Sequence, residues 1–206
     1  TYTYSDATFT VMTAELLEVA NASGEKYFTY VSTDTGITAY KKTAYTAQAG
    51  TLLTTYWYTA SDFQTLRAYL LNASVGGEIY YTIETLDGSS RPTFVRAYSN
   101  AAGTILAASY RMTYHGTTTW INQKIKYSDA SGTVIVATYT YENLASNRLL
   151  TELLATANSK GEIYFEYSVS SPFTKTSYTS SAKTTKIATY TYSSATFTVM
   201  TAELLE

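Results

Sequence analysis

The first 18 residues of this chain are written a second time at its end. Residues 1–18 read TYTYSDATFTVMTAELLE and residues 189–206 read TYTYSSATFTVMTAELLE, so only Asp6 against Ser194 differs. Identity this close indicates duplication of one unit and not convergence on a common pattern. We therefore interpret residues 1–188 as one full repeat period of a tandem array, and residues 189–206 as the start of the next identical repeat.

A shorter pattern inside the period predicts several strands. Threonine and tyrosine favour a pleated, half-buried surface, so each Thr-Tyr-x-Tyr segment is expected to be a strand. These segments are residues 1–4, 55–58, 138–141 and 189–192. Further strands are expected after three Gly-Glu pairs, because apolar and polar residues alternate there. Those pairs begin at Gly24, Gly77 and Gly161.

Glycine-containing loops predict hairpins. Tyr45, Tyr98 and Tyr127 are each followed, five residues later, by a glycine and then by a Thr-led apolar run. Strand, short glycine loop and strand is the sequence pattern of a β-hairpin. A further turn at His115-Gly116-Thr117 is expected to join a long strand at 104–115 to another at 118–127.

Apolar residues with helical spacing lie between these strands and predict helices. The spacing is i, i+3, i+7, or its i, i+4 part, as on one face of a helix. Serine or aspartate just upstream can cap a helix N-terminus, and the glycines Gly24, Gly77 and Gly161 can end it. The residues that show the spacing are Phe9, Met12 and Leu16; Phe63, Leu66 and Leu70; and Leu149 and Leu153.

Together these patterns predict an α+β fold, mainly antiparallel β-sheet, built from sub-repeats of one helix and a three-stranded meander. Leu70, Leu71, Leu153 and Leu154 are expected to be buried in its core. The predicted sub-units are residues 1–54, 55–107 and 138–188, with a hairpin insert at 108–137 between the second and third.

Composition excludes several kinds of chemistry. The chain has no cysteine, so it has neither disulfides nor thiolate metal sites. A net charge of −2 with 15% charged residues argues against a nucleic-acid partner, which needs a basic patch. No apolar stretch is long enough for a membrane span, no phosphate-binding loop is present, and no cofactor is expected.

Few residues are candidates for catalysis or metal binding. His115 is the single histidine, and Ser109 or Asp129 could complete a triad with it, but a solvated histidine at a hairpin end is the preferred interpretation. Glu25, Glu78 and Glu162 recur in each sub-repeat. A residue that recurs in this way is more often structural than catalytic, so no catalytic or metal site is assigned and the chain is not expected to be an enzyme.

Aromatic residues carry the remaining hypotheses. The 22 tyrosines are too many to be all binding sites, so most are expected in the core or at contacts between repeats. The residues expected at the junction of successive repeats are Tyr2, Tyr4, Phe9, Tyr190, Tyr192 and Phe197. Aromatics that could stack on a ligand are Trp57, Tyr80, Trp120 and Tyr164.

These observations favour a structural role. We expect a tyrosine-rich repeat subunit of a long extracellular filament, stalk or cell-surface adhesin, whose copies join head to tail and therefore propagate. The partners expected are copies of the chain itself and, secondarily, glycans or surfaces. The alternative is a carbohydrate- or surface-binding module that uses exposed Tyr and Trp.

Overall fold

The computed structural model describes residues 1–5, 12–31, 40–144 and 147–206. These residues form two compact units. The first unit comprises residues 1–86 and 95–107, and the second comprises residues 87–94 and 108–206.

Every regular element of the described residues is a β-strand. The strands that lie wholly in the first unit are β1 (Tyr2–Tyr4), β2 (Met12–Leu16), β3 (Tyr27–Val31), β4 (Tyr40–Tyr45), β5 (Leu52–Tyr58), β6 (Leu66–Val75) and β7 (Glu78–Leu86). β8 (Pro92–Tyr98) and β9 (Leu106–Tyr114) contribute residues to both units. The second unit also contains β10 (Ile121–Tyr127), β11 (Ile135–Tyr141), β12 (Leu149–Leu154), β13 (Tyr164–Tyr167), β14 (Phe173–Tyr178), β15 (Lys186–Tyr192) and β16 (Met200–Leu205).

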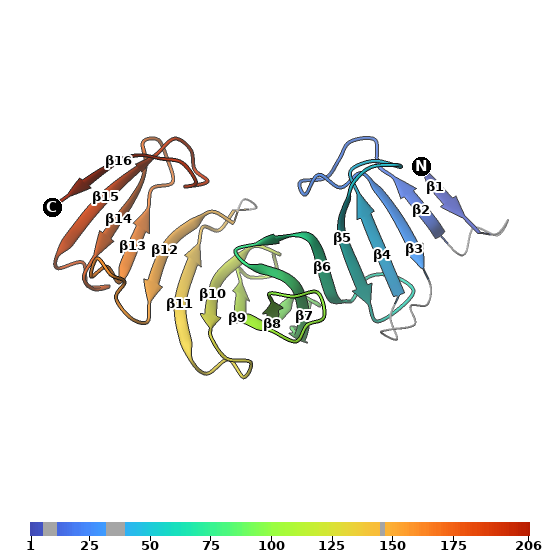
Figure 1. The fold of residues 1–206 in the computed structure, drawn as a ribbon, viewed down its shortest axis with the longest axis horizontal. Helices are drawn as coiled ribbons and strands as arrows, with labels where there is room; N and C mark the ends of the chain where they lie inside the picture. The colour runs from blue at the N-terminus through green and yellow to red at the C-terminus, as the bar shows by residue number, and fades with distance from the viewer. Residues whose placement is uncertain (6–11, 32–39, 145–146) are drawn as a thin grey trace. The chain divides into compact units, whose positions relative to one another are not determined.

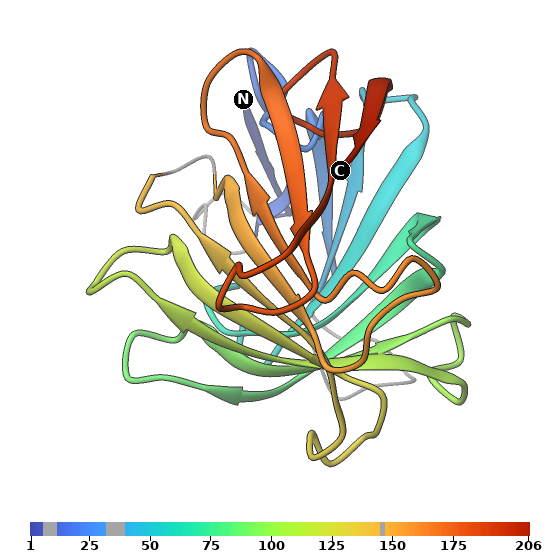
Figure 2. The same cartoon turned by 90° about the vertical axis from the view of Figure 1, so that its left-hand side faces the viewer.

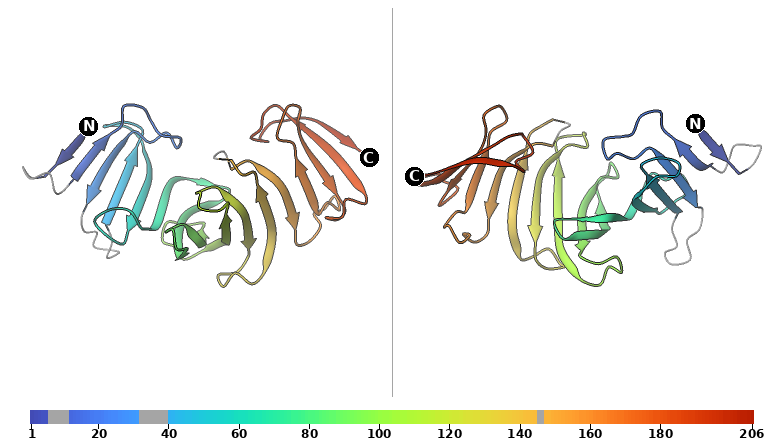
Figure 3. Two further views of the ribbon diagram at one scale, coloured as in Figure 1. Left: turned by 180° about the vertical axis from the view of Figure 1, so that it is seen from behind. Right: turned by 45° about the horizontal axis from the view of Figure 1, so that its top comes forward.

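The order of the strands in the open sheet is their order in the chain, from β1 to β16 (Figure 1). In the first unit, antiparallel ladders join each strand from β1 to β7 to the next. In the second unit, antiparallel ladders join β9 to β16 in the same way. Figures 2 and 3 show the same meander of neighbouring strands from other sides.

The predicted α+β class is wrong, because the described residues contain no helix. They accordingly contain no helix that could cross a membrane. Within the segments predicted as helices, the regular elements of the described residues are the strands β2, β6 and β12. Leu66 and Leu70, like Leu149 and Leu153, are four residues apart, an even separation that puts both side chains on one face of a strand as well as on one face of a helix. The surrounding Thr and Tyr favour the strand.

The predicted helix ends are turns. Asp62 lies just upstream of a predicted helix, where aspartate was expected as a cap. Its carboxylate accepts a hydrogen bond from the Gln64 N–H at 3.0 Å, within the loop between β5 and β6. Gly76 and Gly77, both at positive φ, form the two-residue turn between β6 and β7. Such a turn matches the twist of a hairpin and demands residues that tolerate positive φ. The glycine positions were therefore informative, but for hairpins and not for helices.

The predicted strands and hairpins lie where the sequence placed them. The Thr-Tyr-x-Tyr segments fall in the strands β1, β5, β11 and β15, except that Thr1 precedes β1. The segments after the three Gly-Glu pairs form β3, β7 and β13. The three glycine loops join β4 to β5, β8 to β9 and β10 to β11, and the loop at His115 joins β9 to β10.

The most buried side chains are two phenylalanine rings and several small residues. Among the described residues, Phe28 and Phe165 are 3% and 2% exposed, and the serines Ser109 and Ser177 are fully buried. Leu70, Leu71 and Leu154 are only half-buried and Leu153 is exposed, so the expectation of a leucine core is wrong. The small apolar cluster of the first unit consists of Phe28, Tyr30 and Ala44.

Candidate functional site

The described residues of the two copies pair as the same two-stranded antiparallel ladder, at the two ends of the strand order (Figure 1). Both ladders shift register at the same place, before the second tyrosine of the first strand. In each, a threonine hydroxyl donates a hydrogen bond to the carbonyl opposite, Thr13 to Thr3 at 3.2 Å and Thr201 to Thr191 at 3.1 Å. The paired residues are Tyr2–Glu15, Thr3–Ala14 and Tyr4–Met12 in the first hairpin, and Tyr190–Glu203, Thr191–Ala202 and Tyr192–Met200 in the second.

The two hairpins differ in which edge is covered. β15 is paired on both sides, and Tyr190 is 7% exposed, whereas its counterpart Tyr2 in β1 is 59% exposed. β2 is paired on both sides, and Ala14 is 8% exposed, whereas every residue of β16 is exposed. β15 therefore shows the first strand of the repeated sequence when it is paired on both sides. β2 shows the second strand of the repeated sequence when it is paired on both sides.

Tyr190 is buried, and its hydroxyl group forms two hydrogen bonds with charged side chains. Its hydroxyl donates to the carboxylate of buried Glu162 and accepts a hydrogen bond from the Lys160 ammonium at 3.3 Å. Burial, together with the bond to Glu162, raises the pKa of Tyr190. Burial alone would raise the pKa of Glu162, but hydrogen bonds from Asn158, Ser177 and Tyr190 hold that pKa below its usual value.

Tyr192 and Phe197 meet at the second hairpin. Their rings pack edge to face at 5.2 Å, and Phe197 packs in the same way against Tyr167 at 4.9 Å. Phe197 adopts a positive φ of 52° to make these contacts from its loop. Tyr4, the counterpart of Tyr192, is half-buried in β1, and the predicted junction residue Phe9 lies outside the described residues.

A tyrosine–glutamate–lysine arrangement occurs on one face of the sheet in both units. In the first unit, Tyr30 donates to Glu15 at 2.7 Å, and Lys42 lies 3.9 Å from the centre of the Phe28 ring. Burial, reinforced by Glu15, raises the pKa of Tyr30, and burial lowers the pKa of Lys42. The second unit repeats this arrangement with Tyr167, Glu152, Lys175 and Phe165.

The recurring glutamates Glu25, Glu78 and Glu162 are 5%, 8% and 3% exposed. Each accepts a hydrogen bond from a tyrosine hydroxyl, as Glu25 does from Tyr56 at 2.5 Å and Glu78 from Tyr81 at 3.2 Å. Asparagine side chains also bond Glu25 and Glu162, at 2.8 and 2.7 Å. These carboxylates therefore hold loops and strands together.

The four candidate stacking aromatics are divided between the two units. Trp57 and Tyr80 meet edge to face at 6.0 Å in the first unit, and Tyr80 also lies 5.8 Å from Tyr98. In the second unit, Tyr164 packs against Tyr178 at 6.2 Å, and Trp120 is the residue that ends the β9–β10 loop. All four side chains are half-buried.

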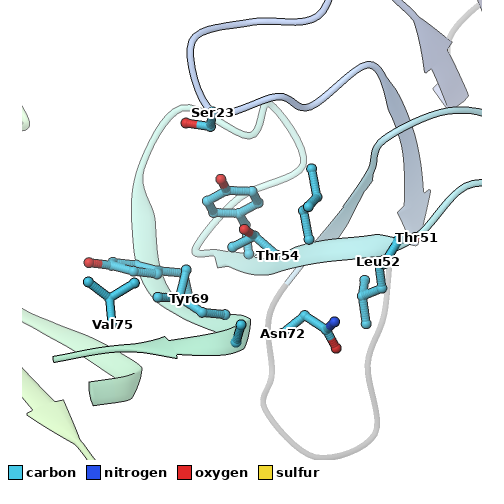
Figure 4. Close-up of a pocket in the computed structure, with 11 residues that line it drawn as sticks. Ser23, Thr51, Leu52, Thr54, Tyr69, Asn72 and Val75 are labelled. Atoms are coloured by element: carbon cyan, nitrogen blue, oxygen red, sulfur yellow. The ribbon is translucent and has the colours of Figure 1, made fainter. Parts of the chain in front are cut away.

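The first unit contains a groove that sequence reasoning missed. It has a volume of about 560 Å³ and lies where β5 begins and β6 ends (Figure 4). Its walls combine hydroxyl, amide and apolar groups, among them Thr54, Tyr56, Tyr69, Leu71 and Asn72. The nearest sequence signal is the Gly76-Gly77 turn, which ends the ten-residue strand β6 that lines the groove.

The nominated catalytic residues are engaged elsewhere. The Ser109 hydroxyl donates to the backbone carbonyl of Asp129 at 2.6 Å, and the His115 Nε2 atom lies 3.2 Å from the carbonyl of Tyr141. The Asp129 carboxylate accepts the N–H groups of its own turn, from Thr133 and Val134, at 2.9 and 2.8 Å. Among the residues that the structure describes, no cluster of acidic and histidine side chains could hold a metal ion.

No known protein family matches the chain, and no curated protein matches it in sequence.

Proposed function

We propose that the chain is a structural repeat subunit of an extracellular filament, stalk or cell-surface adhesin, and that copies join head to tail. The observation that carries the proposal is the pair of identical hairpins at opposite ends of the strand order, each with a different edge unpaired among the described strands. A contact between the two different edges is heterologous, and such contacts extend instead of closing.

Unpaired strand edges also support this proposal on energetic grounds. Proteins usually shield an edge with proline, charge or a bulge turned outward, because its free N–H and C=O groups recruit other strands. β16 carries Leu204 and Leu205, which are 63% and 66% exposed, and one charged residue, Glu203. An apolar and exposed strand such as β16 is suited to pairing with a further strand.

The test is the mass of the purified 206-residue chain as a function of concentration. Analytical ultracentrifugation should show a mass that rises with concentration, and negative-stain microscopy should show unbranched rods. A single monomeric species over the whole accessible range would refute the proposal. The extracellular location, supported by a cysteine-free composition with 15% charged residues, is tested by localising the native protein with an antibody.

The groove in the first unit favours a second candidate, a carbohydrate-binding module. Two tyrosines and several hydroxyl and amide groups meet there, the mixture of ring and hydrogen-bonding groups that sugars use. A glycan array with the whole chain tests it. Binding that is lost in Tyr69→Ala but kept in Trp57→Ala would place the sugar in the groove, and binding lost only in Trp57→Ala would place it at Trp57 and Tyr80. An empty array would refute this candidate.

A further inference from the structure

A pair of tyrosines recurs in each of the three sub-repeats, and the proposed function makes no use of it. The first tyrosine follows the recurring glutamate by two residues, and the second is the last residue of the next strand. The pairs are Tyr27–Tyr45, Tyr80–Tyr98 and Tyr164–Tyr178. Their ring centres lie 6.1, 5.8 and 6.2 Å apart, and their ring planes are tilted by 44°, 33° and 41°. The three pairs therefore share one geometry.

The backbone holds both rings of a pair on one face of the sheet. Tyr27 is directly opposite Tyr45 in the ladder between β3 and β4. Tyr164 is directly opposite Tyr178 in the ladder between β13 and β14. In both ladders the N–H of the residue before the first tyrosine donates to the carbonyl of the second, at 2.9 and 3.0 Å. Residues opposite each other have Cβ atoms about 4.5–5.5 Å apart, so the two rings stay within reach of each other.

Solvent reaches the paired rings. All six are half-buried, whereas Tyr30 and Tyr190 are only 9% and 7% exposed. Cross-strand ring packing stabilises a sheet without any hydroxyl group, and yet all six positions are tyrosine. The hydroxyl is the group through which a tyrosine ring is oxidised.

Another contact between tyrosines, Tyr56 with Tyr69 at 6.3 Å, is not kept in the third sub-repeat. These two residues are opposite each other in the ladder between β5 and β6. At the same place in the ladder between β11 and β12, Tyr139 is opposite Glu152. The side chains at this place therefore vary between sub-repeats, whereas the three tyrosine pairs do not.

The third pair has a proton acceptor beside it. The Tyr178 hydroxyl donates to the Glu166 carboxylate at 3.1 Å, and Lys183 forms an ion pair with that carboxylate. Glu166 is two residues from Tyr164 in β13, so it lies on the face of the pair. Burial and the hydrogen bond to Glu166 raise the pKa of Tyr178, so its proton must leave when the ring is oxidised at neutral pH. The first pair has Thr29 at the position of Glu166.

We propose that these three tyrosine pairs are sites of oxidative coupling, where a one-electron oxidant joins the two rings of a pair into a dityrosine link within one chain. The inference does not depend on head-to-tail assembly. The oxidant takes one electron from each phenol, and each hydroxyl proton leaves, to Glu166 in the third pair. The two phenoxyl radicals form one C–C bond between ring carbons ortho to the hydroxyls. Those carbons then lose their hydrogens as protons, and both oxygens regain a proton. With hydrogen peroxide as the final oxidant, the two electrons and two protons convert one peroxide into two waters.

Oxidation of the natural 206-residue chain by a haem peroxidase and hydrogen peroxide tests the sites. Peptides from the single-chain band of a denaturing gel are analysed by mass spectrometry. The three pairs should appear as linked peptides that lack two hydrogen atoms. The oxidised single chain should also unfold at a higher urea concentration, because each link restricts the unfolded chain.

Two variants provide the matched comparison. Tyr178→Phe should remove the third link and keep the link between Tyr27 and Tyr45, whereas Tyr139→Phe should keep all three. Single chains without links would overturn the proposal. Links that form mainly between Tyr56 and Tyr69, or that are as scattered as those of a chain oxidised in urea, would overturn it as well.

Substitution at Glu166 tests the proton transfer, with the first pair of the same molecule as the control. In the natural chain the third pair should couple faster than the first. Glu166→Gln keeps an oxygen that accepts from Tyr178 but is no longer a base. It should slow the third link at least about tenfold relative to the link between Tyr27 and Tyr45. An unchanged ratio of the two rates would refute the role of Glu166 and leave the coupling sites standing.

Discussion

Raising the pH above 10 should unfold this protein cooperatively, because its tyrosines are held in the neutral form. Burial raises the pKa of Tyr58, Tyr69 and Tyr141 to about 12 each. Tyrosine in an unfolded chain has a pKa of about 10. The stabilisation from these groups is therefore complete below about pH 10 and is lost as pH rises toward about 12, because the unfolded chain ionises first.

The expected loss of stability is a sizeable fraction of the free energy of unfolding of an ordinary domain. At pH 11 a shift of two units costs about 1.4 kcal/mol per tyrosine, which partial exposure reduces to about 1 kcal/mol. Three such residues remove about 3 kcal/mol of the roughly 5–15 kcal/mol that stabilises a domain. Tyr30 and Tyr167, whose pKa values burial and neighbouring carboxylates raise, act in the same direction.

The assay is a pH titration followed at once by tyrosinate absorbance and by circular dichroism. Both signals should change together in one steep transition. Tyr69→Phe should move its midpoint upward by a few tenths of a pH unit, and Tyr2→Phe, at a 59% exposed position, should not. Absorbance that rises along a simple curve near pH 10, while the circular dichroism stays unchanged, would refute the reasoning.

Substitutions at Glu162, Gly103 and Leu70 test the packing, each measured by urea unfolding. Glu162→Ala should cost about 1–3 kcal/mol, because it leaves buried donors without an acceptor, and Glu162→Gln should cost less. Gly103→Ala should cost about 1–3 kcal/mol, because the added Cβ would lie 2.8 Å from the Tyr80 ring and the residue has a φ of 66°. The control Gly88→Ala should be nearly neutral, because no atom lies within 4 Å of the added Cβ. Leu70→Ala should cost only about 1–2 kcal/mol, because the side chain is half-buried, and a loss above about 4 kcal/mol would contradict that shallow burial.

The strands and turns of this fold were predictable, and the absence of helices from the described residues was not predicted. Tyrosine and threonine alternation, with a glycine five residues after Tyr45, Tyr98 and Tyr127, identified strands and hairpins correctly. The spacing of Leu66 and Leu70 led to a wrong prediction of a helix, because side chains four residues apart lie on one face of a helix and also on one face of a strand. Thr-rich surroundings, which disfavour helix, should have outweighed that ambiguous spacing.

Likewise, only part of the candidate site could be predicted from the sequence. Sequence identity alone pointed to Tyr2 and Tyr190 as equivalent residues, but only the ladders show that Tyr190 is covered and Tyr2 is not. Hydrogen bonds between distant residues, such as Tyr190 to Glu162, depend on which strands become neighbours. A pattern of residue types does not show which strands become neighbours. For the same reason, the groove beside Tyr69 was not predicted.

The agreement between sheet order and chain order has a consequence for kinetics. Each strand meets its partner across a short connection, so closing any one hairpin costs little loop entropy. Proteins with such local contacts fold quickly, and a sheet of this kind can grow from one end while the rest of the chain is still being made. Further periods of the proposed array would then add folding steps without slowing any single step. Unfolding would likewise begin with the strands at one end of the sheet.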